Sequence, residues 1–267
     1  MKLPQFTTQK ELFAHLAANK QAIMAEKSFQ PKLADPCSLR GLFVDRHGEL
    51  SKAAPTEETE GDELKRACVI NTTNWLDSHG DVHIPGLWKK SLSENKGLYL
   101  LQEHKMTFAG IITDDVRATT KTLSWRSLGL DTDGNTEALI FNVAIPKDRN
   151  AEMYREYKAN RVKNHSVGMR YVRIEMAIND ADYKTEFAVW NKYIDTIANK
   201  EVAEEKGYFF AVLEAKVVEG SAVPIGSNVI TPTLDTGKGT APAPSQDTQE
   251  PPRKSVFKSV GSKLQTN

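Results

Sequence analysis

One serine in this sequence lies where a predicted helix gives way to a predicted strand, and its surroundings raise the question of nucleophilic chemistry. Residues 162–171 read VKNHSVGMRY, so Ser166 lies between a histidine and a valine-glycine pair. A serine hydroxyl becomes nucleophilic only when a base lies within hydrogen-bond reach and donors stabilise the oxyanion that forms. His165 is a poor base for Ser166, because neighbouring residues on a strand point to opposite faces. A more distant histidine is therefore required.

His104 has the residue type that this role needs. It follows the apolar run of LYLLQEH and precedes a second strand-like run, AGII. Histidine can take and return a proton near neutrality, since its unperturbed pKa is about 6.5. A histidine at the end of a strand can equally be structural, so the sequence leaves both interpretations open.

Glu219 is a charged residue within an apolar stretch, EAKVVEGSAVPIGSN. A carboxylate in a buried strand is costly unless it is paired. We therefore expect Glu219 to have a partner if its strand is central. An exposed edge strand, where water solvates the carboxylate, is the alternative.

A second arrangement of polar residues could hold a metal ion. In DSHGDVHIPG, His79, Asp81 and His83 alternate at every second position, which on a strand places them on one face. Gly80 and Pro85 favour a loop instead, in which such side chains bond locally to the backbone. A metal-dependent hydrolase is the function that the metal interpretation would imply.

The composition is that of an ordinary globular chain with one main domain. Of the 267 residues, 39% are hydrophobic and 26% are charged, which is enough for one sizeable core. Lysine and arginine together number 35, and so do aspartate and glutamate. The resulting net charge of zero gives no electrostatic reason to expect a nucleic acid or an anionic membrane as partner.

Cysteine usage and hydropathy indicate a chain kept in a reducing compartment. Cys37 and Cys68 are far apart and form no CxxC pattern, so neither a disulfide framework nor a zinc site is indicated. The opening MKLPQFTTQKELF has no apolar segment typical of a secretion signal. The longest apolar stretches, near GYFFAVL, fall far short of the roughly 18–20 residues that a membrane span needs. We therefore expect a soluble, unsecreted protein.

The two ends of the chain differ from its middle. Residues 1–63 predict an N-terminal helical arm and a linker: TTQKELFAHLAANKQAIMAEK opens with a capping box of Thr8 and Glu11, and residues 52–63 are acidic and lack large apolar side chains. Residues 235–267 contain four prolines and few large apolar side chains. Because such a segment cannot bury a core of its own, we expect a disordered C-terminal tail.

Residues 64–234 have the pattern of an α+β domain. Short extended pieces such as LYLLQEH and EALIFNVAIP come first, and the Asp-Gly of DTDGNTE predicts a hairpin. KDRNAEMYREYKANRV predicts a helix that ends just before Ser166, and SVGMRYVRIEM predicts the strand that begins there. FAVWNKYIDTIANKEVAEEK predicts a second helix, and GYFFAVLEAKVVEGSAVPIG predicts two further extended runs.

Four motifs, taken in order, resemble those of one known family. The chain carries GDVHIPGLW, EHK, NHSVGMRY and VEGSAVPIGSN within residues 67–232. This order is similar to that of the prohead (capsid maturation) serine proteases of tailed bacteriophages, whose fold is related to the herpesvirus assemblins. In that family a Gly-Asp-x-x-x-Pro-Gly stretch precedes a catalytic histidine, a strand with a Ser-x-Gly pattern carries the nucleophile, and a Glu-x-Ser-x-Val stretch closes the core.

The resemblance implies a fold and a catalytic site. It assigns Ser166 as the nucleophile, His104 as the general base and Glu219 as the acid that orients the histidine, with backbone N–H groups near Gly168 stabilising the oxyanion. It implies a β-barrel-like antiparallel core surrounded by helices. Neither a metal nor an organic cofactor is needed for this chemistry.

The resemblance also implies a biological setting. The expected activity is that of a serine endopeptidase of viral capsid maturation, inside the assembling prohead in the host cytoplasm. Its expected substrates are segments of the major capsid protein and of the scaffold, together with its own termini, and homo-oligomers are expected, with neither nucleic acid nor membrane as partner. The alternative is a non-enzymatic scaffold or capsid-assembly protein on the same fold, in which Ser166 and His104 are idle.

Overall fold

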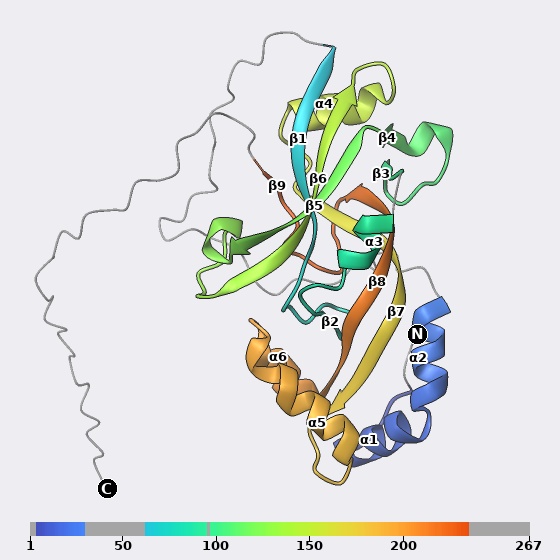
Figure 1. The fold of residues 1–267 in the computed structure, drawn as a ribbon, viewed down its shortest axis with the longest axis vertical. Helices are drawn as coiled ribbons and strands as arrows, with labels where there is room; N and C mark the ends of the chain where they lie inside the picture. The colour runs from blue at the N-terminus through green and yellow to red at the C-terminus, as the bar shows by residue number, and fades with distance from the viewer. Residues whose placement is uncertain (1–3, 30–61, 95–96, 235–267) are drawn as a thin grey trace, which may run out of the picture. The chain divides into compact units, whose positions relative to one another are not determined.

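A computed structural model describes residues 4–29, 62–94 and 97–234 (Figure 1). All of them belong to one compact unit, Met1–Thr236. Most of the predicted linker, residues 52–61, and the whole predicted tail, residues 235–267, lie outside the described residues. The described part is a mixed α+β structure, as the sequence predicts.

The first sheet has four antiparallel strands in the order β5-β6-β1-β9. Its centre is the long pairing of β1 with β6, which sets Cys68 opposite Phe141. The predicted hairpin is present between β5 and β6, although ten residues rather than a two-residue turn connect the strands. The bounds are β1 Glu63–Thr72, β5 Val116–Ser124, β6 Asn135–Pro146 and β9 Thr233–Leu234.

The second sheet is built around β8, which pairs antiparallel with β7 along nearly the whole length of both strands (Figure 1). The short strands β2 and β3 run parallel to β8, and β4 follows β3 in the order β2-β8-β3-β4. The bounds are β2 Asp81–His83, β3 Leu100–Gln102, β4 Ile111–Thr113, β7 Asn164–Ile178 and β8 Tyr208–Val223. The two extended runs expected after the second helix are thus one continuous strand, β8.

The expected β-barrel-like core is wrong, because the two sheets do not close into a barrel. Closure requires every edge strand to find a partner. Among the described strands, β5 pairs with β6 alone, and it carries Arg117 and Lys121 among mostly exposed residues. Charged residues along an edge discourage further pairing, so β5 ends its sheet.

Six helices and three short 3₁₀ turns surround the sheets within the described residues. The predicted capping box is present at the first helix: Thr8 Oγ1 accepts from Glu11 N, and the Glu11 side chain accepts from Thr8 N. The helix that the sequence predicts as one piece is two, which meet at Asn19. The bounds are α1 Gln9–Ala18, α2 Lys20–Phe29, α3 Lys89–Glu94, α4 Ala151–Lys158, α5 Lys184–Tyr193, α6 Lys200–Lys206, η1 Phe108–Gly110, η2 Arg126–Leu128 and η3 Ile194–Thr196.

The helix predicted over residues 187–206 is also divided, into α5, η3 and α6. The break has a tertiary cause at Asn199, whose side-chain amide donates to Leu76 O at 3.0 Å while its oxygen accepts from Leu76 N at 2.9 Å. An asparagine amide imitates a backbone group and so competes with helical hydrogen bonding. The predicted helix before Ser166 is confirmed as α4.

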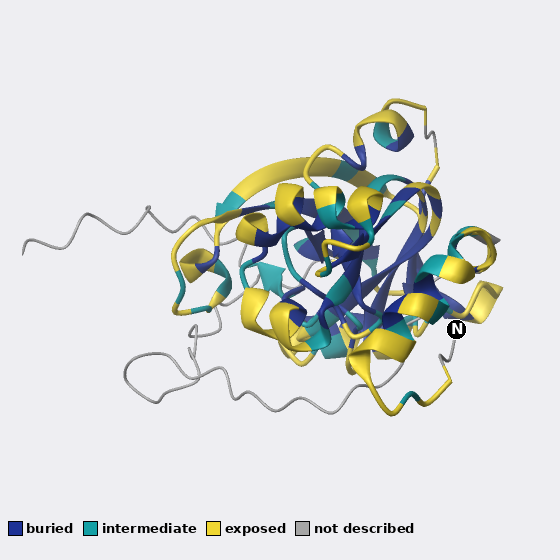
Figure 2. Cartoon of the chain, turned by 90° about the horizontal axis from the view of Figure 1, so that it is seen from below, coloured by how far each residue is buried: buried dark blue, intermediate teal, exposed yellow. Residues whose placement is uncertain are grey.

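Buried residues concentrate in the strands and on the inner faces of the helices (Figure 2). The largest apolar cluster joins both sheets and includes Phe141, Met169 and Val217. Phe13 and Leu16 of α1 and Ile23 of α2 belong to this same cluster, so the N-terminal helices contribute to the main core. In the described part of the chain, every helix is too short or too polar to cross a membrane.

Candidate active site

Ser166 is the third residue of β7, directly opposite Ser221 of β8. Two residues further along, Gly168 lies opposite Glu219. Directly opposite residues of an antiparallel pair project to the same face, and alternate residues of one strand share a face. The pairing therefore brings Ser166, Gly168, Glu219 and Ser221 together on one face of the β7–β8 ribbon.

His165 lies on the opposite face of β7, as strand geometry predicts. Its Nδ1–H donates to Thr231 O at 2.9 Å, so its Nε2 accepts from the Tyr157 hydroxyl, also at 2.9 Å. Burial lowers the pKa of His165 to about 4, although the hydrogen bond to Thr231 acts in the other direction. His165 is therefore a neutral, structural histidine that holds the start of β7 in place.

His104 reaches the face that carries Ser166 because β3 runs beside β8, with Leu101 opposite Ser221. The chain turns immediately after β3, and Glu103 and His104 adopt φ angles of 51° and 57°. Left-handed backbone is uncommon for residues other than glycine and often marks a functional turn. Glu103 N donates to Ala222 O at 2.9 Å, which anchors this turn to β8.

The His104 side chain is hydrogen-bonded to Glu219: Nδ1 lies 2.7 Å from Glu219 Oε1. Both side chains are almost fully buried, with 9% and 5% of their surface exposed. Nδ1 must carry the proton in this bond, because an ionised carboxylate only accepts. Glu219 thus has the partner that its position in a buried strand requires, and His104 is the partner that the resemblance implies.

Fixing the proton on Nδ1 leaves Nε2 of His104 as a potential base. This nitrogen is buried, and none of the described residues forms a hydrogen bond with it. Buried polar atoms without a partner are rare, and each calls for an explanation. A general base awaiting the proton of a nucleophile is one such explanation.

The two serines on this face have different environments. The Ser221 hydroxyl donates to Glu219 Oε2 at 2.6 Å and accepts from His104 N at 3.1 Å, and the residue is fully buried. Ser166 is 6% exposed, and within the described part of the chain its hydroxyl makes no hydrogen bond. Of the two serines, Ser166 is therefore the one whose hydroxyl is not engaged by another group, and it is not hydrogen-bonded to His104 Nε2 in this structure.

Gly168 has a steric role that the sequence did not indicate. A Cβ at this position would lie 2.1 Å from Glu219 Oε1, so only glycine leaves room for the carboxylate. A β-bulge follows at once, where Val218 is the extra residue of β8 between Glu219 and Val217. Such bulges re-aim side chains next to active sites.

The metal interpretation of His79, Asp81 and His83 finds no support. Asp81 is fully buried and forms an ion pair with Lys27, and it accepts from the Tyr171 hydroxyl at 2.7 Å. His83 shares β2 with Asp81, whereas His79 precedes the strand in a turn. Among the described residues, no three histidine, cysteine or acidic side chains form a group that could hold a metal ion.

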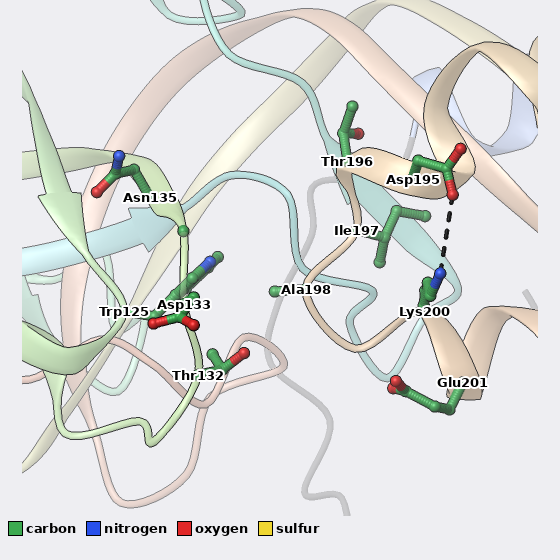
Figure 3. Close-up of a pocket in the computed structure, with 11 residues that line it drawn as sticks. Trp125, Thr132, Asp133, Asn135, Asp195, Thr196, Ile197, Ala198, Lys200 and Glu201 are labelled. Carbon is green, nitrogen blue, oxygen red and sulfur yellow. Dashed lines mark ion pairs between the residues drawn. The ribbon is translucent and has the colours of Figure 1, made fainter.

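A hollow of about 310 Å³ opens between the β5–β6 connection and the η3–α6 segment (Figure 3). Its lining includes Trp125, Asp133 and Glu201, and an ion pair of Asp195 with Lys200 at 3.8 Å. None of Ser166, His104 and Glu219 lines it. Since no histidine lies beside a nucleophile there, the candidate chemistry remains with His104.

Comparisons with known proteins identify no relative: no protein-family model, no curated protein and no solved structure matches the chain.

Proposed function

We propose that this chain is a serine endopeptidase with Ser166 as nucleophile, His104 as general base and Glu219 as the acid that orients the base. The observation that supports the proposal best is the state of His104: its Nδ1 is fixed to Glu219, and its buried Nε2 has no partner among the described residues. A base prepared in this way has little structural purpose but is what an acyl-transfer mechanism needs.

The proposed mechanism gives each of the three residues one role. His104 Nε2 takes the hydroxyl proton as Ser166 Oγ attacks the scissile carbonyl carbon. Glu219 stabilises the imidazolium that forms, through the Nδ1–H bond of 2.7 Å. The imidazolium then returns the proton to the leaving amine, which departs as the tetrahedral intermediate collapses to an acyl-enzyme. A water molecule, deprotonated by the same histidine, hydrolyses the ester and regenerates Ser166.

Backbone N–H groups near Gly168 are the proposed oxyanion donors. They lie on the strand of the nucleophile, two residues from Ser166. Donors held by a strand need no rearrangement when the charge develops, and this preorganisation is the main source of their catalytic effect.

The proposed biological role extends the resemblance in the motifs. We propose that the enzyme acts in viral capsid maturation, inside the assembling prohead in the host cytoplasm. Its proposed substrates are segments of scaffold and capsid protein and its own chain, and its proposed assembly is a homo-oligomer. Cleavage needs a substrate segment that can adopt an extended conformation, and scaffold segments and chain termini commonly can.

Covalent labelling with an alkyl fluorophosphonate tests the chemistry without knowledge of the cleavage site. We expect the wild-type chain to gain one phosphonyl group on Ser166, as located by peptide mapping. Ser166→Ala should gain none, and His104→Ala should react slower by about 10² to 10⁴-fold, because it lacks the general base. Labelling of Ser166 at the same rate with and without His104 would refute the proposal and favour the non-enzymatic scaffold.

A further inference from the structure

We propose that Ser221 is a positioning residue of this site, a role that rests on the proposed protease function. It does not touch the reacting atoms. It acts through His104 and Glu219, whose relative placement it determines.

The inference comes from a closed ring of three hydrogen bonds. His104 N donates to Ser221 Oγ at 3.1 Å, and the Ser221 hydroxyl donates to Glu219 Oε2 at 2.6 Å. The ring closes through Glu219 Oε1, which accepts from His104 Nδ1 at 2.7 Å. Each hydrogen bond in such a chain polarises the next in a low-dielectric interior.

Ser221 fixes the carboxylate of Glu219. Both oxygens of Glu219 accept a hydrogen bond, one from Ser221 and one from His104. Gly168 lies directly under Oε1, where a Cβ would come within 2.1 Å. The two hydrogen-bond donors and the close backbone of Gly168 together hold the carboxylate in a single orientation toward the imidazole.

Ser221 also fixes the backbone of the base. His104 has a φ of 57°, a conformation that costs energy for a residue with a side chain unless its surroundings hold it. The hydrogen bond from His104 N to Ser221 Oγ is one such restraint. Ser221 therefore restrains His104 in two places. It bonds the backbone N–H of His104 directly, and it holds the imidazole through Glu219.

Removing this hydroxyl should therefore loosen the base without removing any reacting group. In Ser221→Ala, Glu219 Oε2 and His104 N each lose their partner. Small displacements of a catalytic group reduce rates strongly, and loss of the partner that orients a metal-ligating histidine, a comparable case, costs about 10- to 100-fold in activity. The loss should fall on the chemical step and leave ligand binding nearly unchanged.

The test compares three single variants with the wild type by fluorophosphonate labelling, with the rate at saturation and the half-saturating concentration measured separately. Ser221→Ala should label Ser166 about 10- to 100-fold slower at saturation, with the half-saturating concentration within about twofold of wild type. Ser221→Thr, which keeps the hydroxyl, should recover most of the rate. Ser91→Ala is the matched control: Ser91 Oγ accepts from Val217 N at 2.9 Å, so it removes a buried serine bond to β8 outside the ring and should label like wild type.

A spectroscopic measurement separates positioning from a loss of stability. In protein labelled with ¹⁵N-histidine, His104 should show a protonated Nδ1 with a slowly exchanging proton, identified by its absence in His104→Gln. Ser221→Ala should lose that slow exchange and Ser91→Ala should keep it. An unchanged His104 signal in Ser221→Ala, together with labelling as fast as in Ser91→Ala, would overturn the positioning role. This measurement also decides the question if Ser221→Thr does not fold.

The outcomes also separate this inference from the proposed function. If Ser166→Ala still labels, the protease proposal itself fails. If Ser166→Ala is inert but Ser221→Ala labels like the control, the protease stands and the positioning role is wrong. A phosphonyl group located on Ser221 in the wild type would overturn the inference by making Ser221 the nucleophile.

Discussion

The buried histidine next to Ser166 should make the fold sensitive to mild acid. Folding lowers the pKa of His165 from 6.5 to about 4, chiefly because burial disfavours the charged imidazolium. Above about pH 7.5 the residue is neutral in both the folded and the unfolded state and has no effect on the pH dependence. As the pH falls from 6.5 to 4, the unfolded chain binds a proton that the folded chain does not, so the free energy of unfolding decreases.

The size of the effect follows from the same two values. The full difference corresponds to about 3 kcal/mol below pH 4, and about 2 kcal/mol is already lost at pH 5 relative to pH 7.5. With a urea dependence of about 2 kcal/mol per molar for a domain of this size, the unfolding midpoint should fall by about 1 M between those pH values.

Urea unfolding of wild type and His165→Gln at pH 7.5 and pH 5 measures this contribution directly. Glutamine can still donate to Thr231 O but does not titrate, so the variant should be less stable at pH 7.5 and should lose about 2 kcal/mol less than wild type at pH 5. His15→Gln, at a half-buried position on α1, is the matched control and should follow wild type. An equal loss of stability in wild type and His165→Gln would refute the reasoning.

Three further predictions concern other parts of the structure. Gly168→Ala should slow labelling of Ser166 by about 100-fold, because the added Cβ would displace Glu219. Gly97 has open space around it, so the control Gly97→Ala should label like wild type. Lys27→Met leaves buried Asp81 without its ion pair, so urea unfolding should show a loss of about 3–5 kcal/mol, against less than about 1 kcal/mol for Lys90→Met in an exposed pair. Burial raises the pKa of Cys68 to about 12, so iodoacetamide at pH 8 should leave Cys68 unmodified in the folded protein and modify it in urea, as peptide mapping can show. Rapid modification of folded Cys68, or equal losses in the two lysine variants, would contradict the described burial.

Local patterns predicted the elements that depend on neighbouring residues. The capping box of Thr8 and Glu11 is an interaction within one helical turn, and the strand around Ser166 follows from apolar and β-branched residues in series. The division of the second helix could not be predicted in this way. It depends on Asn199 meeting the backbone of Leu76, more than 120 residues away in sequence, and periodicity contains no information on that contact.

The candidate site also depends on contacts between residues that are distant in sequence, which local patterns do not specify. Burial cost alone predicted that Glu219 needs a partner, but which histidine fills that role depends on β3 lying beside β8. The spacing of Glu219 and Ser221 was a usable signal, because alternate residues of a strand share a face. The role of Gly168 could not be read from the sequence, since it arises from the cross-strand pairing with Glu219. The open sheets differ from the expected barrel because closure depends on edge strands that short motifs do not specify.

The central claim, that Ser166 is the nucleophile of a protease, is tested most directly by the intact mass of the full-length chain. The wild type and Ser166→Ala, purified identically, are incubated for hours at several concentrations. The account predicts that the wild type shortens at one or both termini while Ser166→Ala keeps its full mass. Equal shortening of both chains, or full mass of both at every concentration, would contradict it.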